Sequence, residues 1–433
     1  MSSPAASLTP DSIFQTIQYL RSPLAIRERC GHVFNLALDD NLEHFRCHLD
    51  ELDGVADYVI AVMKETYPNT AIPFHSRWRH FEGGTSDRLL TFQEQLQTYS
   101  RLEQARIKID LAVVSVLLDA GAGNAWRYTE PGSGFVLSRS EGLAIASFHL
   151  FCSGAFSSNP DQPLQVDADG LRTLNRDALK SGFQISANNP LVGLEGRLNL
   201  LHNLSDALVR SPHLFSCAEK GRGYGETTNS ADIFRPGYLL DYLMQQVSAQ
   251  DIPASLVLSA VLEGLSSIWP GRVTINHVNL GDVWPHPALL DTSLGSTLIP
   301  FHKLSQWLTY SLLEPLEEAG LTITELDSLT GLPEYRNGGL FIDLGVLQPK
   351  HAQVTQSAHS PDSSMIVEWR SLTVILLDHL AQRIRQQLGL TATQLPLACV
   401  LQGGTWSAGR RIAGDRRPGG VPPIQITSDG TVF

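Results

Sequence analysis

Apolar residues recur at helical spacing along most of the 433-residue chain, and strict alternation of apolar and polar residues is rare. This pattern predicts a mainly α, multi-helical protein. The residues from Leu111 to Leu118 are apolar nearly all round, which predicts a central, buried helix. The segments expected to be helical are 24–38, 42–65, 100–120, 139–152, 191–210, 235–247, 253–266, 302–319 and 366–388.

Stretches rich in Gly and Pro interrupt this pattern at 129–134, 154–163 and 218–237. We expect the second to be an exposed connection, and residues 218–230 to form a mobile loop. The domain prediction is a helical N-terminal region over 1–185 and a helical region with a C-terminal tail over 186–433. One core shared by both halves is the alternative.

Charge and composition narrow the function classes. The chain has 32 Lys and Arg against 44 Asp and Glu, a net charge of −12, which argues against a partner that is a nucleic-acid polymer or a membrane surface. No apolar run approaches the roughly 18 residues of a membrane span, and the N-terminus lacks a secretory signal, so we expect a cytoplasmic protein. The five cysteines are scattered and form no C-x-x-C pair, which predicts reduced thiols.

A basic island lies within residues 72–88. His75, Arg77 and Arg79 stand there beside the glycine pair at 83–84, which lets backbone approach an anion closely. One interpretation is a site for a phosphate or carboxylate. The other is that these arginines pair with internal acids across a domain seam, and both stay open.

Two further clusters are rich in aromatic residues. Residues 118–130 combine small residues with polar and aromatic ones that are candidates to line a pocket wall, although helix C-capping explains the glycines equally well. Trp269 and Trp284, with prolines and Asp282 between them, would make a rigid wall for a flat ligand. Packing of both tryptophans in the core is the alternative.

The densest polar cluster spans residues 300–314, 329–339 and 367–370. On a helix, His302 would share a face with the residues at 306 and 310, with Lys303 adjacent. Glu334 to Asn337 follow a proline, at the expected first turn of a helix, where free N–H groups favour an anion. A carboxylate, a hydroxyl, a guanidinium and an amide in consecutive positions predict an active site here.

A last cluster, residues 403–411, carries Trp406 and begins a second basic stretch with four arginines between positions 405 and 420. A tail held against the body by salt bridges is the alternative to a binding role.

These motifs, in unchanged order from about residue 27 to 433, resemble the uracil-catabolism protein family of fungi and bacteria, the Urc-four or Urg-three type. The resemblance implies a pathway in which uracil enters as a nucleotide, a ring-opening enzyme related to GTP cyclohydrolase acts, and urea is released. The strings that carry it include IPFHSRWRHFEGG, SVLLDAGAGNAWRY, NPLVGLEGR, LGDVW, PFHKLSQWLTYSLLEPLE, LTGLPEYRNGGL, VEWRSLTVILLD and GGTWSAGR.

A more distant resemblance concerns FHKLSQWL, LPEYRNGGLFIDLGVL and VEWRSLTVILLDHL, which are similar in order and spacing to segments of the queuosine-salvage N-glycosylases. It implies a helix-hairpin-helix glycosylase-like C-terminal half and cleavage of a base from ribose. In that family an Asp-Tyr-Arg triplet stands where this chain has Glu334, Tyr335 and Arg336. The chain also lacks an aspartate that the relative has at the position of Tyr310–Ser311, which leaves the identity of the catalytic carboxylate open.

Together the resemblances predict an N-ribosyl hydrolase that cuts the bond between ribose 5-phosphate C1′ and a ureido group and releases urea. Its transition state needs a carboxylate, for which Glu334 is the candidate and Glu368 the reserve, Glu368 alternatively orienting Arg336 or Arg370. The hydrogen-bond donors to the leaving group would come from Tyr335, Asn337 and His302. The predicted substrate-binding residues are Arg336, Asn337, Arg370, His302, Lys303, Trp269, Asp282, Trp284, His75, Arg77, Arg79 and Trp406.

In this scheme Lys303, Arg77 and Arg79 hold the phosphate of a small phosphorylated ribose ureide, the two tryptophans 269 and 284 close the pocket, and neither metal nor cofactor is needed. One alternative is a metal-dependent amidohydrolase acting on the ureido carbonyl, with His75, His80, His302 and Glu82 as ligands. Another is a non-catalytic partner of the ring-opening enzyme.

Overall fold

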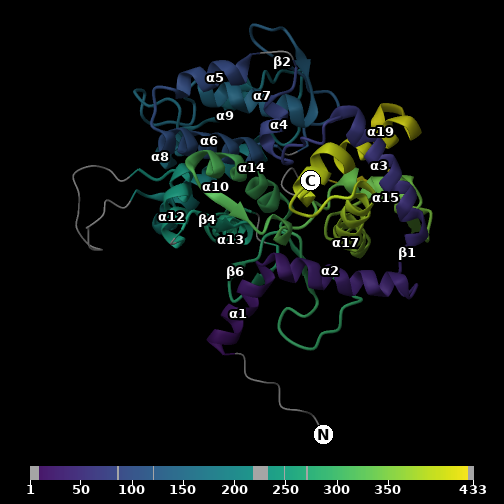
Figure 1. Ribbon diagram of the computed structural model, residues 1–433. Coiled ribbons are helices and arrows are strands. Elements are labelled where there is room, and N and C mark those ends of the chain that lie inside the picture. Colours follow the sequence, from purple (N-terminus) through teal and green to yellow (C-terminus); the bar gives the residue numbers. More distant parts are fainter. Residues whose placement is uncertain are drawn as a thin grey trace. The chain divides into compact units, whose positions relative to one another are not determined.

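The computed structural model describes residues 9–84, 87–119, 121–217, 233–247, 249–269 and 272–427 (Figure 1). Helices dominate and the strands are only two or three residues long, so the prediction of a mainly α fold is confirmed. The chain divides into two compact units that interleave in the sequence. Unit 1 comprises the residues up to 73, 270–303 and 327–427, and unit 2 comprises 74–269 and 304–326. The predicted division at 185/186 lies within unit 2.

Unit 1 is built around helices from both ends of the chain. Its α-helices are α1 (Pro10–Leu20), α2 (Pro23–Leu38), α3 (Leu52–Thr66), α15 (Tyr335–Asp343), α16 (Gln353–Gln356), α17 (Ser364–Leu388), α18 (Leu397–Val400) and α19 (Trp406–Arg416). Its other helical turns are η1 (Leu49–Glu51), the π turn η5 (Leu401–Thr405) and η6 (Pro418–Gly420). Its strand pairs are β1 (Phe45–Cys47) with β10 (Leu347–Pro349), β5 (Thr274–Ile275) with β6 (Val278–Asn279), β7 (Val283–Pro285) with β8 (Leu298–Pro300), all antiparallel, and β11 (Ala358–His359) parallel to β12 (Gln425–Ile426).

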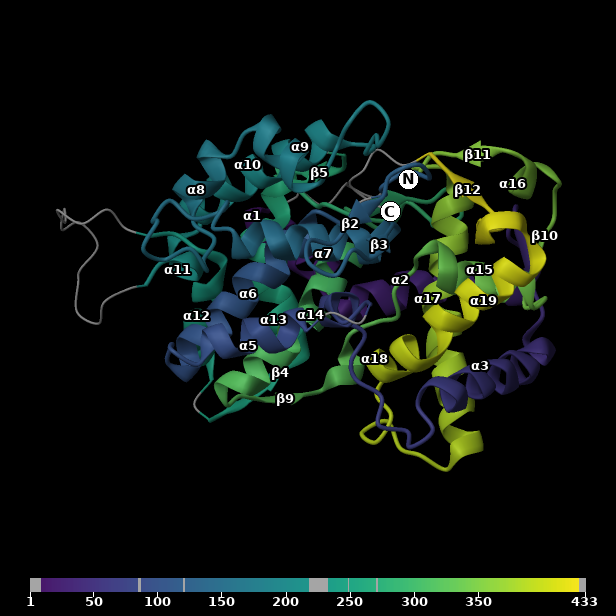
Figure 2. The same ribbon diagram turned by 90° about the horizontal axis from the view of Figure 1, so that it is seen from above.

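Glycines allow α15 to lie against both α17 and α19, and the three helices lie close together in Figure 2. A Cβ at Gly338 would stand 2.7 Å from the Trp369 side chain, and a Cβ at Gly409 would stand 2.3 Å from the Arg336 carbonyl oxygen. Both distances are too short for a real contact, so any other residue would push the helices apart. The glycines of the NGG and SAGR motifs therefore serve close packing.

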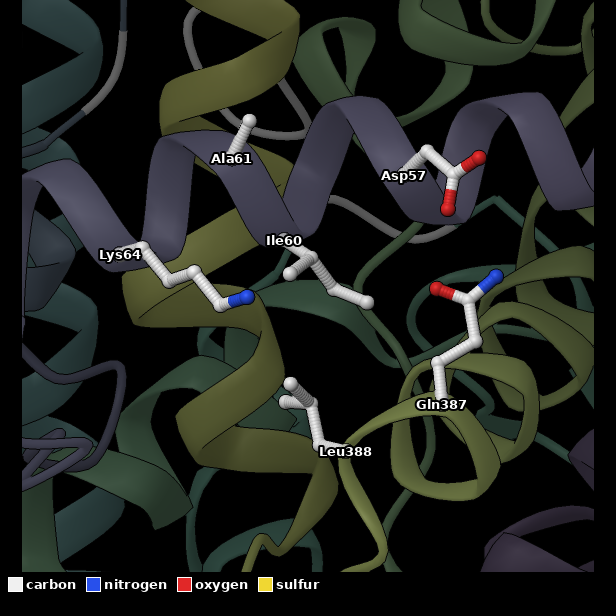
Figure 3. A pocket seen from close by; sticks show the side chains of 6 residues that line it. All are labelled: Asp57, Ile60, Ala61, Lys64, Gln387 and Leu388. Atoms are coloured by element: carbon white, nitrogen blue, oxygen red, sulfur yellow. The ribbon is translucent and has the colours of Figure 1, made fainter.

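A pocket of about 330 Å³ lies between α3 and the end of α17 (Figure 3). Asp57 and Lys64 flank Ile60 on α3, and Gln387 and Leu388 face them from α17. None of the residues predicted for the active site lines this pocket.

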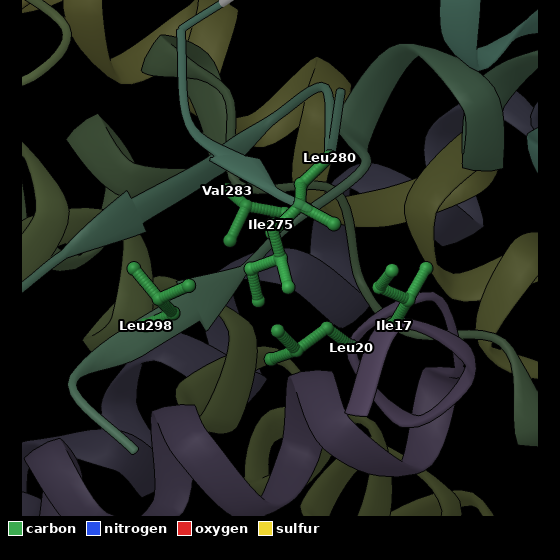
Figure 4. Packing of buried hydrophobic residues seen from close by; sticks show 6 residues of the cluster. All are labelled: Ile17, Leu20, Ile275, Leu280, Val283 and Leu298. Carbon is green, nitrogen blue, oxygen red and sulfur yellow. The ribbon is translucent and has the colours of Figure 1, made fainter. Parts of the chain in front are cut away.

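A hydrophobic cluster joins α1 to the short strands of unit 1 (Figure 4). Ile17 and Leu20 of α1 pack there against apolar residues that flank or belong to β5, β7 and β8, among them Ile275 and Val283. This packing connects α1 to the segment that carries Asp282.

Unit 2 contains most of the remaining helices. They are α4 (Arg77–Phe81), α5 (Arg88–Leu96), α6 (Arg101–Leu117), α7 (Arg139–Cys152), α8 (Ala168–Thr173), α9 (Arg176–Gly182), α10 (Leu194–Arg210), α11 (Pro212–Phe215), α12 (Leu239–Gln246), α13 (Ala254–Leu265) and, apart from its first residue, α14 (Lys303–Ala319). The hairpin β2 (Tyr128–Thr129) with β3 (Val136–Leu137) is antiparallel, and β4 (Asp251–Pro253) runs parallel to β9 (Thr322–Thr324). Short 3-10 turns complete the list, η2 (Pro236–Tyr238), η3 (Ser266–Ile268) and, where the chain returns to unit 1, η4 (Leu326–Ser328).

The predicted central helix is α6, which is buried on every side from Ile107 to Leu117. Its one buried carboxylate, Asp110, receives two hydrogen bonds from Arg235, of 2.9 and 2.6 Å, and one from the Gly237 amide. Burial raises the pKa of Asp110 to about 6 against the opposing charge of Arg235. The buried part of α6 is thus combined with an ion pair that compensates its single buried acid.

Some predicted elements differ from the structure. The segment 42–65 was expected to be one helix, but β1 and η1 precede α3, because the Glu368 side chain and β10 bind the backbone near residue 45. Helices α1, α5 and α19 were not predicted. The predicted mobile loop at 218–230 lies outside the described residues, and no described helix is long and apolar enough to cross a membrane.

Candidate active site

Glu334 caps the N-terminus of α15. Its backbone is extended, and its carboxylate accepts the Arg336 N–H at 2.9 Å and the Asn337 N–H at 2.6 Å. Burial raises the pKa of Glu334, although the Arg336 and Lys303 charges and the two amides act in the opposite direction. The polar stretch after Pro333 does form the first turn of a helix, as predicted, and both carboxylate oxygens of Glu334 are held in place.

The Arg336 side chain lies against aromatic rings. Its guanidinium carbon is 4.0 Å from the centre of the Trp406 ring and 5.6 Å from that of Tyr335. A cation over an indole face is attracted by the ring quadrupole. Trp406 is the first residue of α19, so the contact depends on the close approach of α19 to α15 that Gly409 allows.

Asn337 and Thr405 add polar atoms in the same part of unit 1, where α15 contacts the π turn. Asn337 is fully buried, and its amide donates to the Leu332 carbonyl at 3.0 Å. Among the described residues, Asn337 Oδ1 and Thr405 Oγ1 have no hydrogen-bond partner although both are buried. Buried polar atoms are rarely left without a partner, so these two are available to a ligand or an ordered water.

Asp282 joins three segments of unit 1. Its carboxylate accepts both terminal nitrogens of Arg370 at 2.8 and 2.7 Å, the Trp284 indole N–H at 2.6 Å, and the Lys303 N–H at 3.0 Å. Burial by itself would raise its pKa, but the charge and hydrogen bonds of Arg370 outweigh it and hold the pKa of Asp282 well below its usual range. The carboxylate therefore stays ionised and fixes Lys303 at the start of α14.

His302 does not lie on α14. It precedes the helix with a left-handed backbone of φ 47°, and its Nε2 is 2.8 Å from the Leu20 carbonyl oxygen. The predicted face shared with residues 306 and 310 is therefore wrong for His302. Burial lowers the pKa of His302, which keeps the ring neutral with Nε2–H donating to Leu20.

Glu368, on α17, has partners other than those expected. Its Oε1 accepts the N–H groups of His44 at 3.0 Å and Phe45 at 2.8 Å, while Arg370 pairs with Asp282 instead. Burial raises the pKa of Glu368 to about 7. His286 Nε2 lies 4.0 Å from Glu368 Oε2, and burial lowers the pKa of His286 to about 4. His286 was not among the predicted site residues, although its position between two prolines near Trp284 was a signal.

The basic island belongs to unit 2, and internal carboxylates balance it. Arg79 pairs with Glu82 at 2.8 Å and with Glu314 at 2.7 Å, and Arg77 lies 3.1 Å from Asp119. This arrangement matches the interpretation in which the arginines pair with internal acids. Binding of a phosphate by this island stays a prediction.

The structure therefore sorts the predicted site residues into two groups. His75, Arg77, Arg79 and Trp269 belong to unit 2, where His75 stacks at 6.4 Å on Trp307 and Trp269 is half-buried. Unit 1 contains Glu334, Tyr335, Arg336, Asn337, Trp406, Asp282, Trp284, His302, Lys303, Glu368 and Arg370. In the part of the chain that the structure describes, no three side chains of His, Cys, Asp or Glu are grouped so that they could hold a metal ion.

Comparison with known proteins identifies the family of this chain. The family model described as "Protein of unknown function (DUF1688)" matches residues 19–433, and the chain belongs to this family. It is 38% identical over 455 residues to "Uracil catabolism protein 4" of Lachancea kluyveri, covering 96% of this chain and 99% of that protein. It is also 38% identical over 428 residues to "Protein urg3" of Schizosaccharomyces pombe, covering 97% and 99%. The predicted family membership is confirmed.

Proposed function

We propose that this protein acts in uracil catabolism as an N-ribosyl hydrolase that releases urea from a ribosylurea phosphate. The pathway is supported by the name of the Lachancea kluyveri relative, which the chain matches almost from end to end. The reaction is supported by the surroundings of Glu334, a carboxylate that is buried yet held by two backbone amides within reach of the positive charge of Lys303.

The observation that carries the proposal is the fixed, desolvated carboxylate of Glu334. Hydrolysis at C1′ passes through an oxocarbenium-like transition state, whose positive charge a nearby carboxylate stabilises. Burial strengthens that stabilisation, because charges interact more strongly where water is excluded. Its raised pKa also makes Glu334 a better proton acceptor than an ordinary carboxylate.

In the proposed reaction the C1′–N bond breaks and its electron pair leaves with the ureido nitrogen. Water adds to C1′, and Glu334 takes the proton that this water loses. That proton is delivered to the nitrogen of urea, so the products are urea and ribose 5-phosphate. Asn337 Oδ1 accepts an N–H of the ureido group, while Lys303 and the Arg336 guanidinium on Trp406 face the phosphate.

The test compares Glu334→Gln and Glu334→Asp with the wild-type protein on ribosylurea 5-phosphate, with urea as the measured product. Gln still accepts a backbone N–H but cannot take a proton, so we expect urea release to fall by about 10²–10⁴-fold. Asp keeps the charge and is a good helix cap, so we expect partial activity. Thermal melts of both variants show whether α15 stays folded.

Unchanged urea release by folded Glu334→Gln would reject this proposal. If the wild-type protein releases no urea but co-purifies with the ring-opening enzyme of the pathway, the non-catalytic alternative replaces it. Addition of a chelator to the wild-type assay tests the amidohydrolase alternative, which no specific observation among the described residues supports. The glycosylase-like relationship of the C-terminal half and a cytoplasmic location stay predictions.

A further inference from the structure

A polar cluster is buried in unit 2 around Arg77. The Arg77 side chain is fully buried, and its Nε donates to Ser115 Oγ at 2.7 Å. Its Nη1 donates to the Ser140 carbonyl at 3.3 Å and lies 3.1 Å from Asp119 Oδ2. Trp307 of α14 stands beside the guanidinium, with the ring centre 5.5 Å from the guanidinium carbon. The cluster thus combines groups from α4, α6, α7 and α14.

Three atoms of this cluster are buried without a hydrogen-bond partner among the described residues: Arg77 Nη2, Trp307 Nε1 and Asp119 Oδ1. Two are donors and one is an acceptor. A buried polar group that nothing satisfies destabilises the fold, so three in one cluster indicate a missing bonding partner.

A second buried arginine–carboxylate pair in unit 2 forms two hydrogen bonds, so the fold does not force such a pair to leave atoms without a partner. Arg88 and Glu130 are also buried, but they meet side by side, with Nε and Nη2 each 2.6 Å from a different carboxylate oxygen. The Arg77 pair meets through one nitrogen and one oxygen only. Within this ion pair, the donor Arg77 Nη2 and the acceptor Asp119 Oδ1 therefore lack a hydrogen-bond partner among the described residues.

The segment that carries Asp119 is itself fixed. Arg197 donates Nε to the Leu118 carbonyl at 3.0 Å and Nη2 to the Gly121 carbonyl at 3.3 Å. Arg197 is buried, and burial lowers its pKa to about 10. The buried Arg197 side chain therefore binds the backbone on both sides of Asp119 and holds this carboxylate in position.

We propose that this cluster binds a neutral, planar –CO–NH–CO– group, the edge of a cyclic imide such as uracil or of an open N-acylurea. Two carbonyl oxygens would accept from Arg77 and Trp307, and the N–H between them would donate to Asp119. His75 and His80, at 6.4 and 5.5 Å from the Trp307 ring, add further flat surfaces. A phosphate is disfavoured, because Asp119 and Glu141 already balance the charge of Arg77 and would repel an anion.

The test is calorimetric titration of the full-length protein with uracil, 1-methyluracil, 3-methyluracil, N-acetylurea and inorganic phosphate. Uracil and 1-methyluracil keep the N–H between two carbonyls and should bind. 3-Methyluracil lacks that N–H and should bind at least tenfold more weakly. N-Acetylurea separates an open-chain ligand from a ring, and phosphate should not bind or compete.

Two variants connect the binding to the cluster. Asp119→Asn presents an amide in place of the acceptor oxygen and should weaken uracil binding at least tenfold, and Trp307→Phe, which lacks the indole N–H, should weaken it several-fold. Glu130→Gln is the matched control, because it alters a buried arginine pair of the same unit that has no open atoms, and it should leave binding unchanged.

The inference is wrong if none of the imide or acylurea probes binds, if 3-methyluracil binds as well as uracil, or if phosphate competes. It is also wrong if a crystal grown with uracil shows only an ordered water between Arg77 Nη2 and Asp119 Oδ1. The result is independent of the proposed hydrolysis, because Glu334→Gln should lose urea release yet bind uracil normally. Each proposal can therefore fail while the other stands.

Discussion

Each of the two units buries an arginine against an aspartate, and the two pairs are built differently. In unit 1, Asp282 accepts four hydrogen bonds, two of them from Arg370, and both of its oxygens are used. In unit 2, Asp119 meets Arg77 through Oδ2 alone, and its Oδ1 has no hydrogen-bond partner among the described residues. A complete set of partners indicates a structural role, whereas a buried carboxylate oxygen without a partner is a hydrogen-bonding position that a ligand can use.

Asp282→Asn should produce the largest effect. Every direction around this carboxylate is occupied by a donor, so an amide nitrogen would face another donor and leave Arg370 buried without a counter-charge. We expect the free energy of unfolding to fall by about 3–5 kcal/mol, measured by urea denaturation. Asp169→Asn, in an exposed pair with Arg172, is the control and should change nothing measurable. A smaller loss for Asp282→Asn than for Asp119→Asn would contradict the comparison.

The next effect concerns a third buried acid, Glu368 of unit 1, and depends on pH. Because burial raises its folded-state pKa from 4.5 to about 7, the folded protein binds this proton more tightly than the unfolded chain does. The contribution of this proton to the free energy of unfolding is complete below about pH 4.5 and is lost as the pH rises through 7. Glu368→Gln cannot ionise, so above pH 7 it should be more stable than wild type by up to about 3 kcal/mol.

Denaturation of Glu368→Gln and wild type at pH 5 and pH 8.5 measures this difference. The neighbouring His286 acts in the opposite direction, because its pKa is lowered to about 4 and the stability of its neutral form is lost as the pH falls. Comparing both proteins at each pH cancels that contribution. An identical pH dependence in the two proteins would show that Glu368 is ionised at no cost.

Gly409→Ala should lower the free energy of unfolding by a smaller amount, because it disturbs only the packing of α19 against α15 in unit 1. The new methyl group would stand 2.3 Å from the Arg336 carbonyl oxygen and force α19 away from α15, costing about 2 kcal/mol. Gly414→Ala on the same helix is the matched control, since nothing lies within 4 Å of its Cβ position. Alanine is the better helix former, so the control should be neutral or slightly more stable. Equal melting temperatures for the two variants would refute this packing role.

Asp119→Asn should have the smallest effect on stability, about 1 kcal/mol, because Glu141 remains as a negative charge acting on the buried Arg77. Its amide oxygen can replace Oδ2 beside Arg77, while its nitrogen takes the place of Oδ1, which no described donor faces. Urea denaturation in the presence and absence of uracil would sharpen the contrast with Asp282. Uracil should stabilise the wild-type protein but not the variant.

Local features were predictable from the sequence, and distant pairings were not. The first turn of α15 follows from a proline and a run of polar residues that are adjacent in the chain, and the buried helix α6 from its apolar composition. The pairing of Asp282 with Arg370 joins residues 88 apart, and the hydrogen bond from the Arg77 N–H to Ser311 Oγ joins residues 234 apart. No periodicity or motif specifies such partners. The prediction that Glu368 could orient Arg370 therefore missed that Arg370 pairs with Asp282.

Glycine motifs show the same limit. The glycines at 338–339, 403–404 and 409 lie within the two clusters, 329–339 and 403–411, whose polar and aromatic residues were predicted to contribute to a site. In the structure, a Cβ at Gly404 would stand 2.6 Å from Val59, and one at Gly403 would stand 2.8 Å from Ile72. Such glycines show that something approaches closely, but only the folded chain tells whether it is a ligand or a neighbouring helix.

The π turn at Leu401–Thr405 leads without a break into α19, whose first residue is Trp406. A π turn spans one residue more than an α turn, so the direction of the indole depends on the number of residues before it as well as on their identity. If the same five residues formed regular α-helix, the extra residue would no longer be absorbed, and Trp406 would be rotated by about 100° around the axis, away from Arg336. The number of residues at this point and the π turn that accommodates them therefore together determine the direction of Trp406.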